Sequence, residues 1–432
     1  MTLLTNVLIA AGIVALVLAM FGRVPRELRV LMLTAFVDMV GVLMIAPLLP
    51  FYAKELGADA FTLAAIISAF SAAQLLSAPF WGRVSDRYGR KPALIIGLVA
   101  SAVSYVVFAY ADTLWLLLLS RIVQGAGGGT VGVIQAYVSD AVGPKERAKG
   151  LGWLSAATNA GVTLGPLIGS MTTNVGRAAP GLMAAALCVV NIAFVVFVLR
   201  ETHGAAARAK AKAARSPREV VWRVIRHPGE APSRLIWIYS VAIGAFYGVM
   251  VSGVLTFFLI DRFGATEQTI GFFISYNGVL NVIFRALLLG RVVDRLGEAR
   301  TNRLGLVLLA LGLFLTPLTH SIPTYALAAA LLPLGATFTF PAVTAMLSQA
   351  VSDYERGMYM GVQQTFGGVV RVLLPLAIGW TWKHFVERSP SHPLPQLSFW
   401  LSAALVLAML PITTGVRLYR PRTGEHPAAA AD

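Results

Sequence analysis

Long apolar segments recur along the whole chain, and they limit its fold more than any other feature of the sequence. A transmembrane helix needs about 20 consecutive, mostly apolar residues to cross a bilayer. The apolar residues here are continuous, whereas the strands of a transmembrane barrel alternate apolar and polar positions. The sequence therefore predicts an all-α membrane protein with thirteen candidate spans, at residues 3–22, 30–52, 61–81, 92–111, 114–138, 149–172, 180–199, 235–260, 268–289, 304–320, 323–348, 358–381 and 397–416.

The composition agrees with many spans and excludes the main soluble classes. Hydrophobic residues make up 57% of the 432 residues and charged residues only 13%, against about 25% charged residues in soluble domains. A soluble protein of this size cannot bury so much apolar surface, and disordered chains are polar and rich in charge. The single cysteine, Cys188, excludes a disulfide framework or a cysteine-based zinc site within one chain.

The basic residues are distributed unevenly between the loops. Of 35 Lys and Arg residues, 27 lie in one alternating set of loops. Basic loops favour the cytoplasmic side, so we expect this set and the C-terminus to face the cytoplasm from a cell membrane, in contact with anionic lipid. The net charge of +15 is thus a topology signal and indicates no nucleic-acid partner. Five basic residues lie in the other loops, Lys54, Arg177, Arg262, Lys383 and Arg388, and three within spans, Arg121, Arg285 and Arg371.

The longest polar segment, residues 201–233, divides the chain into two halves. Within it, residues 217–226 mix valines with arginines, which predicts a short amphipathic helix on the membrane surface. The first run has no basic residue before it and three arginines after it, unlike a secretory signal, and predicts an extra N-terminal helix. The predicted organisation is a hydrophobic segment 1–29, a six-helix bundle 30–200, a central loop 201–233, a second six-helix bundle 234–417 and a cytoplasmic tail 418–432.

The two halves repeat each other. Residues 82–92 read GRVSDRYGRKP and residues 290–300 read GRVVDRLGEAR, an offset of 208, and Pro166 and Pro375 recur at an offset of 209. Both segments lie at the same end of the second span of their half. Parallel repeats of six spans build one architecture of secondary transporters, in which the substrate site lies between the halves near the middle of the membrane.

Four segments carry a resemblance to a known family. They are residues 82–91 (GRVSDRYGRK), 121–125 (RIVQG), 161–169 (GVTLGPLIG) and 36–41 (FVDMVG). With them the chain resembles the major facilitator superfamily, and within it the drug–proton antiporters with twelve core spans, of which the tetracycline–proton antiporters are most similar. The resemblance implies two six-helix bundles related by a pseudo-two-fold axis. It also implies proton-coupled export of small amphipathic compounds by alternating access, with the proton gradient as the energy source, no cofactor and a monomeric protein.

Asp38 is the only acidic residue deep within a span, roughly 13 Å from its basic end at 1.5 Å per residue. Arg121 lies at a similar depth in another span. A carboxyl group can load and release a proton when burial favours its neutral form and a nearby cation favours its charged form. We therefore predict that Asp38 carries the coupling proton and that Arg121 tunes it; a buried pair that serves packing alone is the alternative.

Two glycine-containing motifs have predicted conformational roles. Gly161, Gly165 and Gly169 are four residues apart and share one helix face, where another helix can approach closely, and Pro166 adds a kink; the family implies a seal against leak. Residues Gly82, Asp86, Arg87, Gly89, Arg90 and Lys91 are expected to form a cytoplasmic latch against the other half, as the resemblance implies. In the second copy Glu298 and Ala299 replace Arg90 and Lys91, which puts its latch role in doubt.

Further polar and aromatic residues within the spans are candidates for the substrate cavity. Arg371 is too deep to extend to the membrane surface, as Arg285 can, so Arg371 and Arg121 keep transport of an organic anion open as an alternative. An enzyme is not expected, because the sequence has no His-Glu-x-x-His pair for zinc and no serine with an obvious base within the membrane. A receptor on the same fold is a further alternative. The cavity candidates are Gln124, Gln135, Asn159, Tyr247, Tyr276, Asn277, Asn281 and Arg371.

Overall fold

The computed structural model describes residues 26–128, 130–141, 147–199, 201, 217–352, 355–388 and 394–414. The predicted extra helix at 3–22 and the tail from 418 lie outside these residues. Within them the regular structure is helical. The first half consists of α2 (Arg26–Ile45), α3 (Leu49–Glu55), α4 (Ala60–Tyr88), α5 (Arg90–Ala109), α6 (Leu114–Gly128), α7 (Val131–Ala141), α8 (Arg147–Thr172) and α9 (Ala179–Val198).

The second half has the same general plan. A short helix, α11 (Pro217–Arg226), precedes it. The remaining helices are α12 (Ala231–Met250), α13 (Val254–Phe263), α14 (Glu267–Phe284), α15 (Gly290–Leu315), α16 (Ile322–Ala350), α17 (Arg356–Trp382) and α18 (Gln396–Leu407), with five-residue π-helices η3 (Arg285–Leu289) after α14 and η5 (Lys383–Glu387) after α17.

The described helices account for twelve membrane crossings. Ten segments are long and apolar enough to span a bilayer. One of these, Glu267–Leu318, has 52 residues, about 78 Å of helix at 1.5 Å per residue, and its backbone leaves the helical conformation at Gly297, so it makes two crossings. The twelfth is α8, whose 26 residues include several Gly, Ser, Thr and Asn residues that make it less apolar.

The sequence repeat is also a repeat of backbone conformation. Gly89, between α4 and α5, has φ 111° and ψ 161°. Gly297, 208 residues later, has φ 73° and ψ 162°. Residues with a side chain rarely adopt this region, so glycine lets the chain turn there from the second span of each half into the third. The matched turns give the two halves the same local path.

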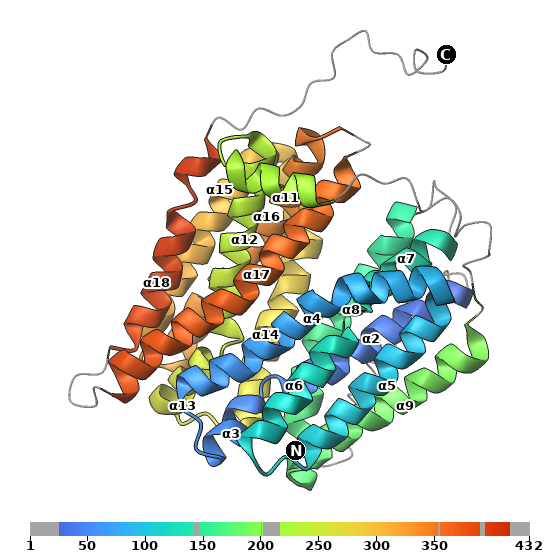
Figure 1. The fold of residues 1–432 in the computed structure, drawn as a ribbon. Coiled ribbons are helices and arrows are strands. Elements are labelled where there is room, and N and C mark those ends of the chain that lie inside the picture. The colour runs from blue at the N-terminus through green and yellow to red at the C-terminus, as the bar shows by residue number, and fades with distance from the viewer. Residues whose placement is uncertain are drawn as a thin grey trace, which may run out of the picture.

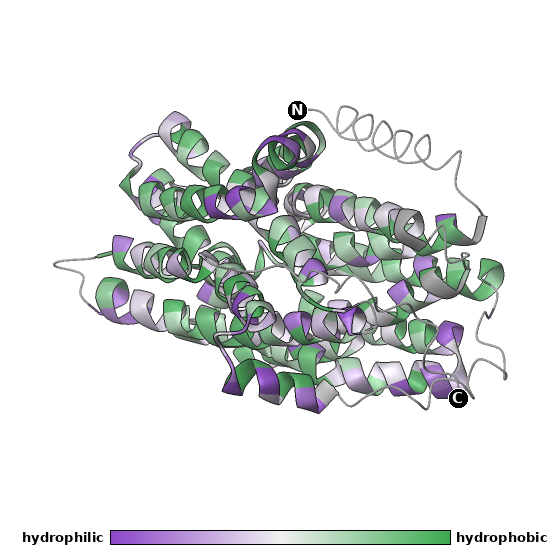
Figure 2. Cartoon of the chain, turned by 90° about the horizontal axis from the view of Figure 1, so that it is seen from above, coloured by the Kyte–Doolittle hydropathy of each residue, from purple (hydrophilic) through white to green (hydrophobic). Residues whose placement is uncertain are grey.

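The helices form two bundles that meet along two pairs of helices. Figure 1 shows α2 to α9, in blue to green, beside α12 to α18, in green to red. α8 packs on α14 and α4 packs on α17, so each half contributes one helix to each contact. Hydrophobic residues predominate along the helices (Figure 2), and many are exposed on the outer surface, as a lipid-facing surface requires.

One face of the molecule carries most of the charged loops. It is formed by residues 83–91, 218–234 and 291–303 and is called the basic face below; the other end is called the opposite face. The predicted amphipathic helix is confirmed as α11. Its Val220 and Val224 are buried against the second half, in contact with α12 and α17, whereas Trp222 is exposed. Much of its apolar face therefore packs on protein rather than on lipid.

Candidate functional site

Asp38 lies in the middle of α2, and only 6% of its surface is exposed. It has no ion pair or hydrogen bond within the part of the chain that the structure describes. Its side chain borders a cavity of about 680 Å³, a volume typical of small-molecule sites. The cavity is lined by Ala35, Asp38, Met39, Val131, Gly132, Ile134, Gln135, Ala136, Leu151, Leu154, Ser155, Thr158, Asn159 and Arg285.

The cavity combines an apolar wall with a few polar groups. The lining residues of α8 come from its first half, which begins at the basic face, so the cavity lies between Asp38 and that face. Two predicted cavity residues, Gln135 and Asn159, do line it. The Asn159 amide donates to the Ser155 carbonyl oxygen at 2.7 Å, which orients its side chain along α8.

Arg285 is the one lining residue that comes from the second half. The sequence analysis predicted that Arg285 lies nearer the basic end of its span, where its long side chain can extend toward the membrane surface. In the structure it begins the π-helix η3 and borders the cavity that also contains Asp38. No hydrogen bond or ion pair of Arg285 is present among the described residues.

Arg121, on α6, is buried and does not line the cavity. Only 3% of its surface is exposed, its guanidinium lies 5.4 Å from the centre of the Phe108 ring, and its Nε and Nη2 have no hydrogen-bond partner among the described residues. Asp38 and Arg121 do not form an ion pair in this conformation. The predicted role of Arg121 as a tuning residue therefore stays a prediction.

Tyr105 connects these two charges, and the sequence analysis did not identify it. This fully buried residue of α5 interacts electrostatically with both Asp38 and Arg121. Its hydroxyl accepts a hydrogen bond from Gln124 at 2.9 Å and packs on α2 at Gly41. Gln124, a predicted cavity residue, thus holds Tyr105 instead. A tyrosine within the apolar run at 92–111 was the available signal, because a buried hydroxyl needs a partner.

The glycine motif of α8 brings this helix onto the one that carries Asp38. A Cβ atom at Gly161 would lie 2.6 Å from the carbonyl oxygen of Phe36, and one at Gly165 would lie 2.7 Å from Leu43 Cβ. Gly169 faces Met44 in the same way. Pro166 lies on the other side of α8, where its carbonyl oxygen would be 2.6 Å from a Cβ atom at Gly271 of α14. α8 is therefore packed between α2 and the second half.

The remaining cavity candidates lie elsewhere. The Tyr276 hydroxyl donates to the Ala326 carbonyl at 3.0 Å, and the Asn277 amide donates to the Phe273 carbonyl at 3.0 Å. Arg371 Nε donates to the Gly367 carbonyl at 3.3 Å, with the guanidinium 5.5 Å from the centre of the Tyr247 ring. These residues and the half-buried Asn281 do not line the Asp38 cavity.

The predicted latch segment makes contacts with its own half. Arg90 Nη1 bonds to Asp86 Oδ1 and to Ser85 Oγ, both at 2.8 Å, and Lys91 Nζ donates to the Val196 carbonyl at 2.7 Å. Arg87 lies over the Tyr88 ring. A Cβ atom at Gly82 would meet nothing within 4 Å, so the close approach expected there is not made in this conformation.

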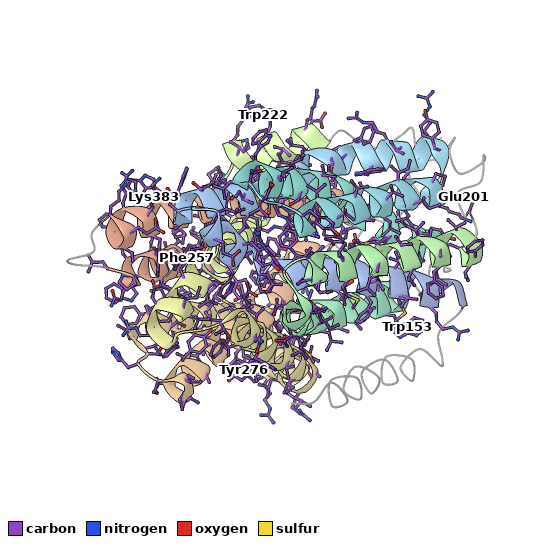
Figure 3. The ribbon with its side chains drawn as sticks, turned by 90° about the horizontal axis from the view of Figure 1, so that it is seen from below. Trp153, Glu201, Trp222, Phe257, Tyr276 and Lys383 are labelled. Carbon is purple, nitrogen blue, oxygen red and sulfur yellow. The ribbon has the colours of Figure 1, made fainter. Side chains whose placement is uncertain are left out.

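Glu201, which follows α9, has a structural role that the sequence analysis did not predict. Its carboxylate accepts the backbone N–H groups of Arg90 and Lys91, both at 3.0 Å, at the start of α5. A carboxylate at a helix N-terminus is favourable because it satisfies unpaired N–H groups. Figure 3 shows Glu201 far from Lys383, which lies at the opposite face.

The comparisons with known proteins agree with this architecture. The Major Facilitator Superfamily pattern matches residues 31–299 and 249–432. "Tetracycline resistance protein, class H" of Pasteurella multocida is 26% identical over 393 residues, covering 90% of this chain and 95% of that protein. "Multidrug resistance protein 2" of Bacillus subtilis (strain 168) is 27% identical over 347 residues, covering 80% and 86%.

Two solved structures show the same fold. The human organic anion transporter MFSD10 (TETRAN) has a TM-score of 0.67 at 22% identity, covering 90% of this chain and 99% of that one. The nucleoside transporter NupG has a TM-score of 0.72 at 15% identity, covering 91% and 100%. The predicted all-α fold and family are thus confirmed. The chain is a multi-pass membrane transporter rather than an enzyme, and it belongs to the major facilitator superfamily.

Proposed function

We propose that this transporter exports small amphipathic compounds in exchange for protons, by alternating access of its two halves, with Asp38 as the proton-carrying group. The observation that carries the proposal is an unpaired carboxyl group on the wall of a cavity within the membrane. An ionisable side chain at this depth is costly and is a functional candidate by default. The tetracycline and multidrug resistance relatives support the same substrate class.

The geometry supports competition between a proton and a substrate cation for one carboxylate. When Asp38 is charged, its oxygens attract a cationic group in the cavity. When Asp38 is protonated, that attraction is lost and the substrate can leave. Tyr105 interacts electrostatically with both Asp38 and Arg121 and does not line the cavity, so it connects the two charges without occupying the substrate volume.

The orientation in the membrane follows from the distribution of basic residues. We infer that the basic face is cytoplasmic, that the protein lies in the cell membrane, and that the C-terminus is inside. The cavity then lies on the cytoplasmic side, where an exporter loads its substrate. The two bundles, 30–200 and 234–417, move against each other as units, the monomer is the working form, and the proton gradient supplies the energy without a cofactor.

A reconstitution experiment tests the proposal. Purified protein in liposomes, with an imposed pH gradient, is expected to accumulate amphipathic dyes and to move protons with them. Asp38→Asn should abolish accumulation driven by the gradient and weaken exchange of labelled for unlabelled cationic dye, because the neutral amide neither binds a proton nor attracts the cation. Asp112→Asn, an exposed carboxylate at the opposite face, is the matched control. Full gradient-driven accumulation by Asp38→Asn would refute the assignment.

The organic-anion alternative has less support. It relies on Arg371 and Arg121, and neither residue lines the Asp38 cavity. Arg371 is instead bonded to its own helix and stacked on Tyr247. The likeness to an organic anion transporter, at 22% identity, is a likeness of fold alone.

A further inference from the structure

The cavity holds two opposite charges that are not paired with each other. Asp38 comes from the first half and Arg285 from the second. Neither has an ion pair or hydrogen bond within the described ranges. Asp38 is buried, and a buried charge usually pairs with an opposite charge, whereas Arg285 is exposed on the cavity wall and available to a ligand. A ligand that supplies both missing partners would therefore be favoured over one that supplies a single partner.

The position of Arg285 is set by an irregular backbone. It is the first residue of a π-helix, a local widening of the helix. π-helices are rare in proteins, but those that occur often lie at functional sites. A guanidinium group presents several donors in one plane and suits a carboxylate or another anionic oxygen pair. The lining of the same cavity includes Met39, Ile134, Leu151 and Leu154, so the cavity also suits an apolar body.

We propose that the preferred substrates are zwitterionic amphipathic compounds, with a cationic group at Asp38 and an anionic group at Arg285. This inference rests on the proposed export function and specifies its substrate class. A purely cationic compound satisfies Asp38 but meets repulsion from Arg285. A purely anionic compound has the reverse difficulty. Since the two charges belong to different halves, a bound zwitterion connects the halves through its own two ends.

A pair of dyes that differ in one charge tests this specificity. Rhodamine 110 carries a free carboxylate and is zwitterionic, whereas its methyl ester, rhodamine 123, is a cation of nearly the same shape. With the full-length protein in liposomes, we expect the carboxylate dye to have the higher kcat/KM. Arg285→Gln should lower kcat/KM for the carboxylate dye about tenfold, equivalent to about 1.4 kcal/mol, and leave that for the ester nearly unchanged. Arg285→Lys should retain part of the preference.

Arg291→Gln is the matched control, because Arg291 lies one to two turns further along the same segment, is exposed and does not line the cavity. It should keep the native preference. Equal losses for both dyes in Arg285→Gln, or no loss for either, would overturn the zwitterion proposal while proton-coupled export of the ester still stood. If the native protein carried neither dye, both this inference and the proposed export of amphipathic compounds would fail for this class.

Discussion

The two faces of this transporter hold the halves together in different ways. At the opposite face, Lys383 Nζ lies 2.5 Å from Asp59 Oδ2, and Glu387 accepts the Ala60 N–H at 3.0 Å. A Cβ atom at Gly379 would lie 2.9 Å from the Ala60 carbonyl oxygen. These contacts join the start of α4 to the end of α17, across the boundary between the halves.

At the basic face, the charged contacts described above join helices of the same half. Glu201 connects the end of α9 to the start of α5, and Arg90 bonds to Asp86 within residues 82–91. In the second copy, Glu298 accepts a hydrogen bond from Gln349 at 3.1 Å, again within one half. The comparison teaches that contacts between the halves hold the opposite face closed, whereas the cavity lies toward the basic face.

The largest expected effect comes from the close helix contact at the opposite face. Gly379→Val should force α17 away from α4, because its side chain would collide with Ala60 and Ala64. Overpacking costs about 1–3 kcal/mol, so the population open at this face should rise about tenfold. The measurement is the distance distribution between spin labels at Asp112 and Leu318 in a Cys188→Ala chain.

Gly361→Val is the control for this change. Gly361 lies on the same helix, and a Cβ atom there meets nothing within 4 Å. An unchanged distance distribution in Gly379→Val, or an equal change in both variants, would show that this contact does not hold the face closed.

A smaller effect should distinguish the two copies of the repeat at the basic face. Gly297→Ala should lower the free energy of unfolding by about 1 kcal/mol, because alanine is strained in this backbone conformation. A Cβ atom there meets nothing within 4 Å, so no steric clash adds to the strain. Gly89→Ala should lower the free energy of unfolding by about 2 kcal/mol, because the new Cβ atom also displaces Glu201 from the N-terminus of α5. Thermal unfolding of the purified variants gives the comparison; equal midpoints would contradict it.

The smallest effect concerns the ion pair at the opposite face. Partial burial of Asp59 acts to raise its carboxyl pKa, but hydrogen bonds from Lys383 and from the Thr62 N–H outweigh it, so the pKa lies below its ordinary value of 3.8. The contribution of the Asp59–Lys383 ion pair to closure of the opposite face is therefore complete above pH 3.8. It is lost only as the pH falls through the lowered pKa of Asp59.

In an Asp38→Asn chain, which lacks the proposed proton-coupling group, spin-label distances should accordingly stay constant from neutral pH down to that value. In the same chain, Lys383→Met should shift the distance distribution at every pH above that value. The shift corresponds to a change of up to about 1 kcal/mol in the equilibrium between the closed and open forms of the opposite face, because a partly exposed ion pair contributes no more. A transition between pH 5 and 7 in the Asp38→Asn chain would instead assign the closure to a different group.

The sequence predicted the number of core spans, the two halves and their repeat, because these depend on the length and order of apolar runs. The rotation of each helix about its axis was harder to predict. Membrane helices are apolar on all sides, so their pattern gives little information on which side faces the cavity. Arg371 is the deeper arginine in the sequence, yet Arg285 lines the Asp38 cavity in the structure.

Partners of buried residues were only partly predictable. The spacing of Gly161, Gly165 and Gly169 indicated a close helix neighbour, but the identity of that neighbour, α2, depends on tertiary packing. Tyr276 had the same sequence signature as a cavity residue, and its hydroxyl bonds to α16 instead. An aromatic residue fits both environments equally well, so composition alone does not separate them.

The placement of α8 has a consequence for the distance over which a proton must act. One side of this helix touches the backbone of α2 beside Asp38, and the other side touches Gly271 of α14. A change of charge on the aspartate is thus separated from the second half by one helix thickness, about 10 Å. Coupling between protonation of Asp38 and movement of the second half then requires no chain of intervening side chains, because the single helix α8 contacts both α2 and α14.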